Sequence, residues 1–368
     1  MRIVIKTGTN LIADQKGLRT KFLKSFVKQV SFLYGKGHEI LIVSSGAIGS
    51  GIKRLGFEKK FFSLPEKQAV AAVGQVVLMQ EYKKLFRTHG IPVGQILLDH
   101  DDVKCKEKNI NARNTINKLL EWRVIPIINE NDTVATEEIK FGDNDALAGI
   151  VAGLISADRV VILTNVDGVF TKNPKKFKDA EIVSYMENVH ELIKKLDLKG
   201  KTDYGTGGML SKLQTAKNLN YLGIPLVITN GNRKNALANA VERSGDDKGD
   251  GTFIQKKNIK LEAKKKWILT SLKSKGSVKI DKGAEKFIIE KGKSLLPVGV
   301  KECTGDFVFG DAVDIMDEKL NIIGKGITNY SAADLCRIKG KRSAEIKKMF
   351  KEVFFEEVIH RDNMFLYQ

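Results

Sequence analysis

The stretch Asn129-Glu-Asn-Asp-Thr-Val-Ala-Thr-Glu-Glu-Ile-Lys-Phe-Gly-Asp-Asn-Asp145 decides the fold of this chain and the place of its candidate site. It follows Val124-Ile-Pro-Ile-Ile128, a short β-branched run that predicts a buried strand. It leads into Ala146-Leu-Ala-Gly-Ile-Val-Ala-Gly-Leu-Ile155, which is long enough and rich enough in helix formers to predict a buried helix. Polar side chains therefore gather at a strand end and a helix start, where open α/β sheets bind ligands.

The polar residues of this stretch are more numerous than helix capping requires. Capping at a helix N-terminus explains one aspartate, such as Asp143. It does not explain Asp132, Asp143, Asn144 and Asp145 together. Convergent polar groups of this kind are typical of a binding pocket, and we interpret the cluster as functional.

Strands alternate with helices on both sides of this stretch. Short β-branched runs predict strands, and longer segments with apolar residues at helical spacing predict helices. The predicted strands span residues 3–5, 39–43, 91–98, 124–128, 159–164 and 225–229, and the predicted helices span 19–34, 65–88, 109–122, 146–155, 189–196 and 205–221. Such alternation is typical of a mainly parallel sheet covered by helices on both faces.

Three glycine-containing loops follow predicted strands or open a predicted helix. Lys6-Thr-Gly-Thr-Asn10 places a cation beside flexible backbone, and Ser44-Ser-Gly-Ala-Ile-Gly-Ser-Gly51 offers backbone N–H groups to an anion. Gly205-Thr-Gly-Gly-Met-Leu-Ser-Lys212 combines a helix start with a lysine. Each loop alone could be an ordinary tight turn. None has the spacing of a P-loop or of a dinucleotide-binding fingerprint.

The composition limits the class of protein. The chain has 368 residues, of which 42% are hydrophobic, so it can form two domains with a substantial core. It contains no run of eighteen apolar residues, and we expect neither a membrane span nor a signal peptide. Three distant cysteines, Cys105, Cys303 and Cys336, favour a reducing, cytoplasmic location without a disulfide framework. The scattered histidines give no zinc-ligand spacing.

The net charge of +18 is compatible with nucleic acid or with anionic substrates. From Gln255 onward the excess is +8, so the remaining +10 belongs to the first 254 residues. We interpret this dispersed, mostly lysine excess as ordinary surface charge.

We predict three regions: residues 1–254, a linker at 255–274 and a small β-rich barrel at 275–368. The barrel's predicted strands are 277–280, 307–309, 312–315 and 321–323, followed by a final helix at 345–353. In the first region, Asn165-Val-Asp-Gly-Val-Phe170 with Lys172-Asn-Pro174 predicts a hairpin or lid at the sheet edge.

Taken together, these motifs resemble the amino-acid kinase family, and within it the members that phosphorylate glutamate. Lys6-Thr-Gly-Thr9 is similar to the family's first phosphate loop, Ser44-Ser-Gly-Ala47 to its second glycine loop, and Gly205–Met209 with Lys212 to its nucleotide loop. Ile127–Val134 with Gly142–Asp145 is similar to the segment that distinguishes glutamate kinases.

The last hundred residues resemble a PUA domain. The resemblance rests on four motifs: Lys293-Ser-Leu-Leu-Pro297, Gly305-Asp-Phe307, Gly310-Asp311 and His360-Arg-Asp-Asn363. The expected architecture is an amino-acid kinase fold followed by a PUA barrel.

The resemblance implies ATP-dependent phosphorylation of the γ-carboxylate of L-glutamate with Mg²⁺, as the first step of proline biosynthesis. It implies that Lys6 and Lys212 are a catalytic pair held by Asp145. The implied substrate-binding residues are Ser45, Gly46, Asp132 and Asn144, and the implied metal ligands are Asp143 and Asp145. The implied ATP-binding residues are Lys6, Gly8, Thr164, Asn165, Thr206, Gly207, Gly208, Met209, Leu210, Ser211 and Lys212. The attacking carboxylate is ionised at neutral pH, so no general base is required.

Two positions depart from the family pattern. Asn165 stands where an acidic or other polar residue is frequent, and Leu210-Ser211 stands where Ser-Thr is frequent. Both belong to the expected nucleotide edge and affect only its finer contacts.

Two other interpretations stay open. The first is a related kinase for carbamate, aspartate, acetylglutamate or a nucleoside monophosphate. The second is an RNA-binding protein acting through the PUA domain, although that region shows no basic stripe with interleaved aromatics. The resemblance further implies a homodimer or homotetramer and feedback inhibition by proline.

Overall fold

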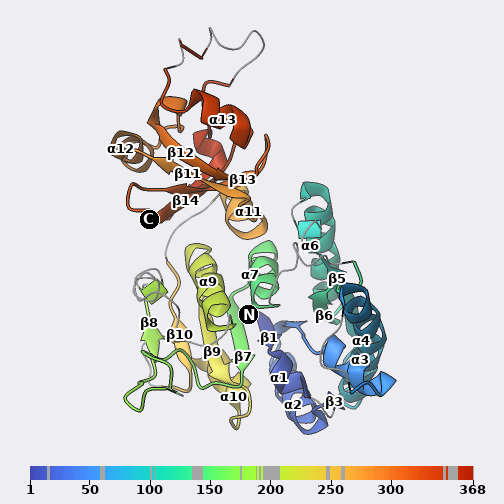
Figure 1. Ribbon diagram of the computed structural model, residues 1–368. Coiled ribbons are helices and arrows are strands. Elements are labelled where there is room, and N and C mark those ends of the chain that lie inside the picture. Colours follow the sequence, from blue (N-terminus) through green and yellow to red (C-terminus); the bar gives the residue numbers. More distant parts are fainter. Residues whose placement is uncertain are drawn as a thin grey trace. The chain divides into compact units, whose positions relative to one another are not determined.

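A computed structural model of the chain divides into two compact units, Met1–Ile259 and Lys260–Gln368 (Figure 1). The structure describes residues 1–14, 17–58, 63–99, 102–103, 105–134, 144–174, 176–187, 189, 192–193, 208–245, 249–257, 262–342, 345–346 and 355–367. Each unit is described by itself below.

The first unit is built on an eight-stranded sheet with the strand order β5-β6-β4-β1-β7-β9-β10-β8. Neighbouring strands from β5 to β9 are parallel, β10 is antiparallel to β9, and β8 is parallel to β10. The strands span Arg2–Thr7 (β1), Glu39–Val43 (β4), Val93–Leu98 (β5), Ile125–Glu130 (β6), Arg159–Thr164 (β7), Tyr185–Met186 (β8), Leu226–Asn230 (β9) and Thr252–Ile254 (β10). The predicted, mainly parallel sheet is confirmed.

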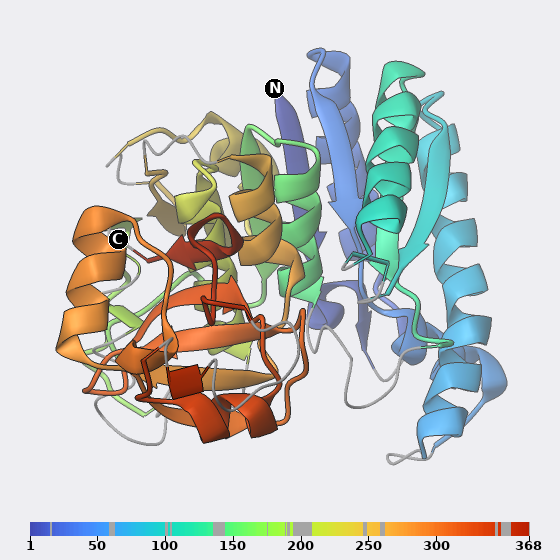
Figure 2. The ribbon, with the colours of Figure 1, turned by 90° about the horizontal axis from the view of Figure 1, so that it is seen from above.

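Helices cover both faces of this sheet, as Figures 1 and 2 show. One face carries α2 (Thr20–Gly35), α4 (Leu64–Arg87) and α10 (Ala236–Glu242), and the other carries α6 (Lys106–Glu121), α7 (Asn144–Leu154) and α9 (Gly208–Tyr221). The predicted sandwich is therefore also confirmed. Short elements join β1 to α2, namely α1 (Thr9–Ile12), β2 (Ala13–Asp14) and β3 (Gly17–Leu18).

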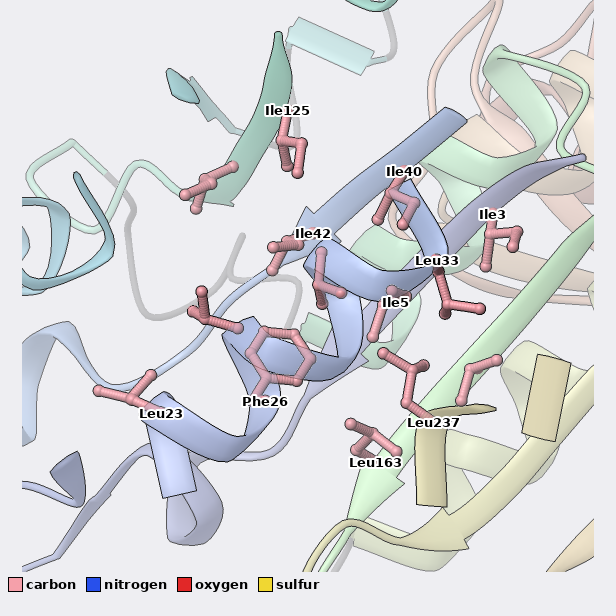
Figure 3. Close-up of a cluster of buried hydrophobic side chains, with 14 of the residues drawn as sticks. Ile3, Ile5, Leu23, Phe26, Leu33, Ile40, Ile42, Ile125, Leu163 and Leu237 are labelled. Atoms are coloured by element: carbon pink, nitrogen blue, oxygen red, sulfur yellow. The ribbon is translucent and has the colours of Figure 1, made fainter. Parts of the chain in front are cut away.

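The alternation of side chains along β1 assigns Lys6 to one face. Ile3 and Ile5 lie in the core cluster beneath α2, where Leu23, Phe26 and Leu33 meet Ile40 and Ile42 of β4 (Figure 3). Because successive strand residues point to opposite faces, Val4 and Lys6 point to the face that α7 covers. The fold thus turns the lysine at the end of β1 toward the start of α7.

Helix α3 (Ala47–Leu55) crosses α4 at backbone contact. A Cβ atom on Gly51 would lie 1.9 Å from the Val70 carbonyl oxygen, and one on Gly74 would lie 1.8 Å from the Ala47 carbonyl oxygen. Only glycine allows this approach, since any side chain would overlap main-chain atoms. The crossing fixes the loop that precedes α3 against α4.

The predicted hairpin after β7 is present. Main-chain hydrogen bonds join Thr171 N–H to Glu181 and Val183 N–H to Val169, with a bridge between Phe170 and Ile182. Of the helix predicted at 189–196, the structure describes only residues 189 and 192–193.

The second unit contains a five-stranded sheet with the order β12-β11-β13-β14-β15. The strands are β11 (Gly276–Ile280), β12 (Val300–Gly305), β13 (Ala312–Met316), β14 (Ile322–Ile327) and β15 (Met364–Leu366). In the described part of this unit it is accompanied by α11 (Ala263–Ser271), α12 (Lys282–Lys291), α13 (Ala332–Ile338) and the 3₁₀ turns η1 (Pro297–Gly299) and η2 (Arg361–Asn363). The β-rich character predicted for this region is confirmed.

Two details of the second unit differ from the predictions. The strand predicted at 307–309 is wrong. Phe307 fills the core, and hydrogen bonds between Val308 and Asp311 close a turn in which Gly310 adopts φ of +85°. Residues 263–271, inside the range predicted as a linker, form α11. Most of the helix predicted at 345–353 lies outside the described residues.

We predicted no disulfide framework, and the structure pairs two of the three cysteines. Cys303 of β12 and Cys336 of α13 form a disulfide, whereas Cys105 is an exposed free thiol. Packing of α13 against β12 brings together two residues 33 positions apart, which spacing alone does not reveal.

Among the helices that the structure describes, none combines the length and the apolar character needed to cross a bilayer.

Replacing Gly74 with alanine is expected to destabilise the first unit. The new methyl group would overlap the Ala47 carbonyl, and overpacking of this kind costs ~1–3 kcal/mol or more. Thermal unfolding of Gly74→Ala should therefore occur at lower temperature than that of the wild type. The matched control is Gly35→Ala at the end of α2, where nothing lies within 4 Å of the added methyl group. Equal melting of both variants would contradict this account of the α3–α4 crossing.

Candidate active site

The carboxyl ends of the central parallel strands meet at one edge of the sheet. Lys6 lies near the end of β1, Ser44 and Ser45 follow β4, and Asn129 lies near the end of β6. Thr164 ends β7, and Asn230 ends β9. Parallel pairing brings these chain segments side by side, and ligands of open α/β sheets bind at this edge.

Two lysines share one buried aspartate at this edge. The Lys6 ammonium nitrogen lies 2.6 Å from Asp145 Oδ1, and the Lys212 ammonium nitrogen lies 2.7 Å from Asp145 Oδ2. The Asp145 side chain is fully buried, and the side chains of Lys6 and Lys212 are 4% and 10% exposed. The structure therefore brings together the three residues that we predicted as the catalytic group.

Each member of this triad comes from a different element. β1 supplies Lys6, the first turn of α7 supplies Asp145, and the second turn of α9 supplies Lys212. Lys212 also donates a hydrogen bond to the Gly208 carbonyl oxygen at 3.1 Å, which ties its ammonium group to the start of α9. With two ammonium groups and one carboxylate, the triad has a net charge of +1 in a nearly dry position, which suits a phosphate chain.

A second group of side chains surrounds Asn144. Its amide nitrogen lies within hydrogen-bonding distance of the Ser44 carbonyl oxygen, Ser45 Oγ and Asn129 Oδ1, at 2.8, 2.8 and 3.0 Å. Asn129 in turn donates to Gln75 Oε1 of α4 at 2.9 Å. The structure thus joins the predicted substrate residues Ser45 and Asn144 through direct contact.

The loop that carries Ser45 is held from both ends. Ser44 Oγ lies 3.0 Å from the hydroxyl oxygen of Tyr82, a fully buried residue of α4. Burial raises the pKa of Tyr82 to about 12, so the phenol stays neutral and can donate to Ser44. Gly46 adopts φ of +101°, and a Cβ atom there would lie 2.8 Å from Ile12. A side chain at position 46 would therefore strain the backbone and collide with α1.

The ends of β7 and β9 form a neighbouring polar group. Gly8 N–H donates to the Leu163 carbonyl oxygen at 3.0 Å, which extends the pairing of β1 with β7 into the first glycine loop. Thr164 is buried, and Asn165 next to it is exposed. Gly208, Met209 and Ser211 are half-buried at the start of α9, whereas Leu210 is exposed.

Sequence reasoning missed Asp167 and Arg233 at the same edge. Asp167 Oδ1 accepts from Asn230 Nδ2 at 2.9 Å and from Arg233 Nε at 3.0 Å. These hydrogen bonds, led by the one from Arg233, lower the pKa of Asp167. Arg233 also pairs with Asp250 before β10, so it connects three loops of the sheet edge.

Sequence reasoning also left Asn129 and Gln75 without a role. Asn129 stood in the stretch from which the prediction began, and its position at the end of a buried strand was an available signal. Gln75 lies within a long helix, where nothing in the pattern distinguishes it from a surface glutamine.

The remaining predicted residues are placed as follows. Asp132 is half-buried in the turn after β6, at the same sheet edge. Thr206, Gly207 and Asp143 lie outside the described residues. Their predicted contacts stay predictions.

The side chains that the structure describes do not form a protein-held metal site. No group of three or more histidine, cysteine or acidic side chains converges within the described part of the chain. Both oxygens of Asp145 face ammonium groups, whose positive charge opposes direct binding of a divalent cation. Binding of Mg²⁺ by Asp145 through water molecules stays a prediction.

Comparison with known proteins agrees with this geometry. Residues 1–230 match the model of the Amino acid kinase family. This chain belongs to the amino acid kinase family. Residues 276–350 match the PUA domain.

The chain is similar to curated relatives over almost its whole length. The glutamate 5-kinase of Dictyoglomus thermophilum is 43% identical over 366 residues, covering 99% of this chain and 97% of that protein. The glutamate 5-kinase of Caldanaerobacter subterraneus subsp. tengcongensis is 40% identical over 365 residues, with the same coverage of 99% and 97%. Among solved structures, UMP kinase from Bacillus anthracis covers 69% of this chain and 95% of its own, with 16% identity and a TM-score of 0.48.

Replacing Asp145 with asparagine is expected to destabilise this amino acid kinase domain. The change leaves two buried ammonium groups facing each other without a counter-charge, which typically costs ~3–5 kcal/mol. Urea-induced unfolding should show the loss, and the double variant Asp145→Asn with Lys6→Met should recover part of it because one buried charge is removed.

The control for this prediction is Asp179→Asn, which removes an ion pair with Lys172 at the exposed surface. Its free energy of unfolding should equal that of the wild type within error. A wild-type unfolding curve for Asp145→Asn would show that the buried triad does not hold these elements together.

Proposed function

We propose that this chain is a glutamate 5-kinase, which transfers the terminal phosphoryl group of ATP to the γ-carboxylate of L-glutamate as the first step of proline biosynthesis. The observation that carries the proposal is the Lys6–Asp145–Lys212 triad beside the Ser45–Asn144 contact. The full-length similarity to glutamate 5-kinases supports the choice of substrate.

In this proposal, Lys6 and Lys212 neutralise the negative charge that develops on the transferring phosphoryl group. Phosphoryl transfer needs in-line positioning and cations on the phosphoryl oxygens rather than covalent chemistry from the protein. Asp145 holds the two ammonium groups in place before ATP arrives, so little reorganisation remains for the reaction step. Magnesium enters as part of the Mg-ATP substrate, bound through the nucleotide phosphates.

The nucleotide lies along the ends of β7 and β9 and the start of α9 in this proposal. Gly8 offers close backbone approach, while Thr164 and Asn165 form the neighbouring rim. The residues from Gly208 to Lys212 supply backbone donors at a helix N-terminus, an established kind of phosphate site.

The amino acid lies on the other side of the triad, at the loop before α3. Ser45, Gly46 and Asn144 bind the substrate through hydrogen bonds, and Asp132 pairs with its α-ammonium group. The γ-carboxylate is already ionised at neutral pH and attacks without a general base.

Several finer expectations from the family resemblance stay predictions. They concern Mg²⁺ ligation by Asp143, a homodimer or homotetramer, feedback inhibition by proline, RNA binding by the PUA domain and a cytoplasmic location.

The direct test is ADP release with Mg-ATP across a panel of acceptors. L-Glutamate should give at least tenfold higher kcat/KM than aspartate, acetylglutamate, carbamate or UMP, because only glutamate presents both its α-ammonium group and its γ-carboxylate to the residues above. A coupled spectrophotometric assay measures this ratio, with L-proline added in a parallel series. A higher kcat/KM for another acceptor would contradict the assignment of glutamate as the substrate.

Lys212→Ala is expected to lower kcat far more than it raises KM for glutamate. The lost ammonium group stabilises charge that develops in the transition state, so kcat should fall by a factor of roughly 10²–10³. Lys234→Ala, which removes an exposed lysine, is the control and should keep wild-type kinetics. Near-normal turnover of Lys212→Ala would remove Lys212 from the catalytic pair.

A further inference from the structure

Three carboxamides from three elements form a chain of hydrogen bonds beside the amino-acid site. Asn129 Nδ2 of β6 donates to Gln75 Oε1 of α4 at 2.9 Å, and Asn144 Nδ2 of α7 lies 3.0 Å from Asn129 Oδ1. Asn129 is 2% exposed, so this chain runs through the interior of the domain. α4 reaches the site through the side chain of Gln75.

Main-chain contacts fix which end of Asn129 and of Asn144 faces the site. A carboxamide has one donor end and one acceptor end, and partners decide between its two orientations. The Glu130 N–H can only donate and lies 3.0 Å from Asn129 Oδ1, so Asn129 turns its acceptor end toward Glu130 and Asn144 and its donor end toward Gln75 Oε1. Asn144 then gives its donor end to Asn129, Ser44 and Ser45 and must present its acceptor end elsewhere.

That acceptor end has no partner in the described part of the chain. Asn144 Oδ1 is buried without a hydrogen bond, while the other end of the same carboxamide contacts Ser45. A buried acceptor left unpaired loses its hydration without compensation, so its presence at a candidate site points to a ligand that donates a hydrogen bond. An α-ammonium group is such a donor.

We infer that Gln75 is a positioning residue of the amino-acid site, which orients Asn129 and, through it, the acceptor oxygen of Asn144 toward the substrate's α-ammonium group. The inference rests on the proposed function and deepens it. Gln75 acts through Asn129 and touches neither the nucleotide nor the phosphoryl group. Its effect therefore falls on amino-acid binding and on recognition of the ammonium group.

A purely structural role for Gln75 would have different consequences. If the side chain only joined α4 to β6, its removal would lower thermal stability and would affect both substrates alike. The two roles separate in the KM values for glutamate and ATP, and in the preference for glutamate over glutarate, which lacks the α-ammonium group.

The test compares Gln75→Met, Gln75→Glu and Gln80→Met. Methionine matches the length of glutamine but cannot accept from Asn129, glutamate keeps an acceptor there, and Gln80 is an exposed residue of the same helix. Gln75→Met should raise KM for glutamate about tenfold, the effect of one lost hydrogen bond, with kcat and KM for ATP within about twofold. Its preference for glutamate over glutarate should fall by a similar factor.

The other two variants complete the expectation. Gln75→Glu should stay within about threefold of the wild type in KM for glutamate, because the acceptor for Asn129 is retained. Gln80→Met should match the wild type in every parameter. Melting curves recorded for all variants show whether each one is folded.

Distinct results overturn distinct statements. An unchanged KM for glutamate in Gln75→Met overturns the inference alone, as does a parallel rise of KM for both substrates with a lowered melting temperature. If Gln75→Met does not fold, a tenfold rise of KM in folded Gln75→Glu overturns it. Wild-type protein that fails to phosphorylate glutamate overturns the proposed function and this inference with it.

Discussion

The site of this protein depends on one buried carboxylate between two ammonium groups. Without Asp145, Lys6 and Lys212 would repel each other in a position that excludes water, where charge interactions are strong. With it, the three groups form a compact cluster with one surplus positive charge. That cluster also requires β1, α7 and α9 to meet at one point, so the same contact serves folding and chemistry.

The sheet edge carries a charged group of side chains and a neutral one. In the proposed reaction the lysines supply charge for the phosphoryl group, and the neutral hydrogen-bonded group of Ser45, Asn129 and Asn144 binds the amino acid. Neutral amides discriminate by geometry, since a substrate that cannot complete their hydrogen bonds leaves them unpaired. The loop that carries Ser45 is held in place by the α3–α4 crossing and by the Tyr82–Ser44 contact.

The layers could be predicted from local sequence signals, whereas the triad was predicted from the resemblance to the amino-acid kinase family. β-Branched runs alternating with helical segments indicated the parallel sheet, and Lys6, Asp145 and Lys212 stood next to glycines at element ends. Gln75 and Arg233 left no such signal, because their importance comes from contacts with distant segments. The Phe307–Phe309 run gave a false strand signal, since a single buried aromatic within a turn also produces an apolar triplet. The Cys303–Cys336 pair could not be predicted from the sequence either, because only the packing of α13 on β12 brings the two residues together.

The central position of β1 has a consequence for how the protein reaches its working form. β1 pairs on one side with β4, which begins at Glu39, and on the other with β7, which begins only at Arg159. Parallel pairing between distant segments forms slowly, because the entropy cost of closing the intervening loop comes before the stabilising contacts form. Helices such as α4 form from local contacts, so helical content returns early when the chain refolds. Catalytic competence then appears only once the whole sheet is assembled, which makes enzymatic turnover a late and stringent reporter of native structure.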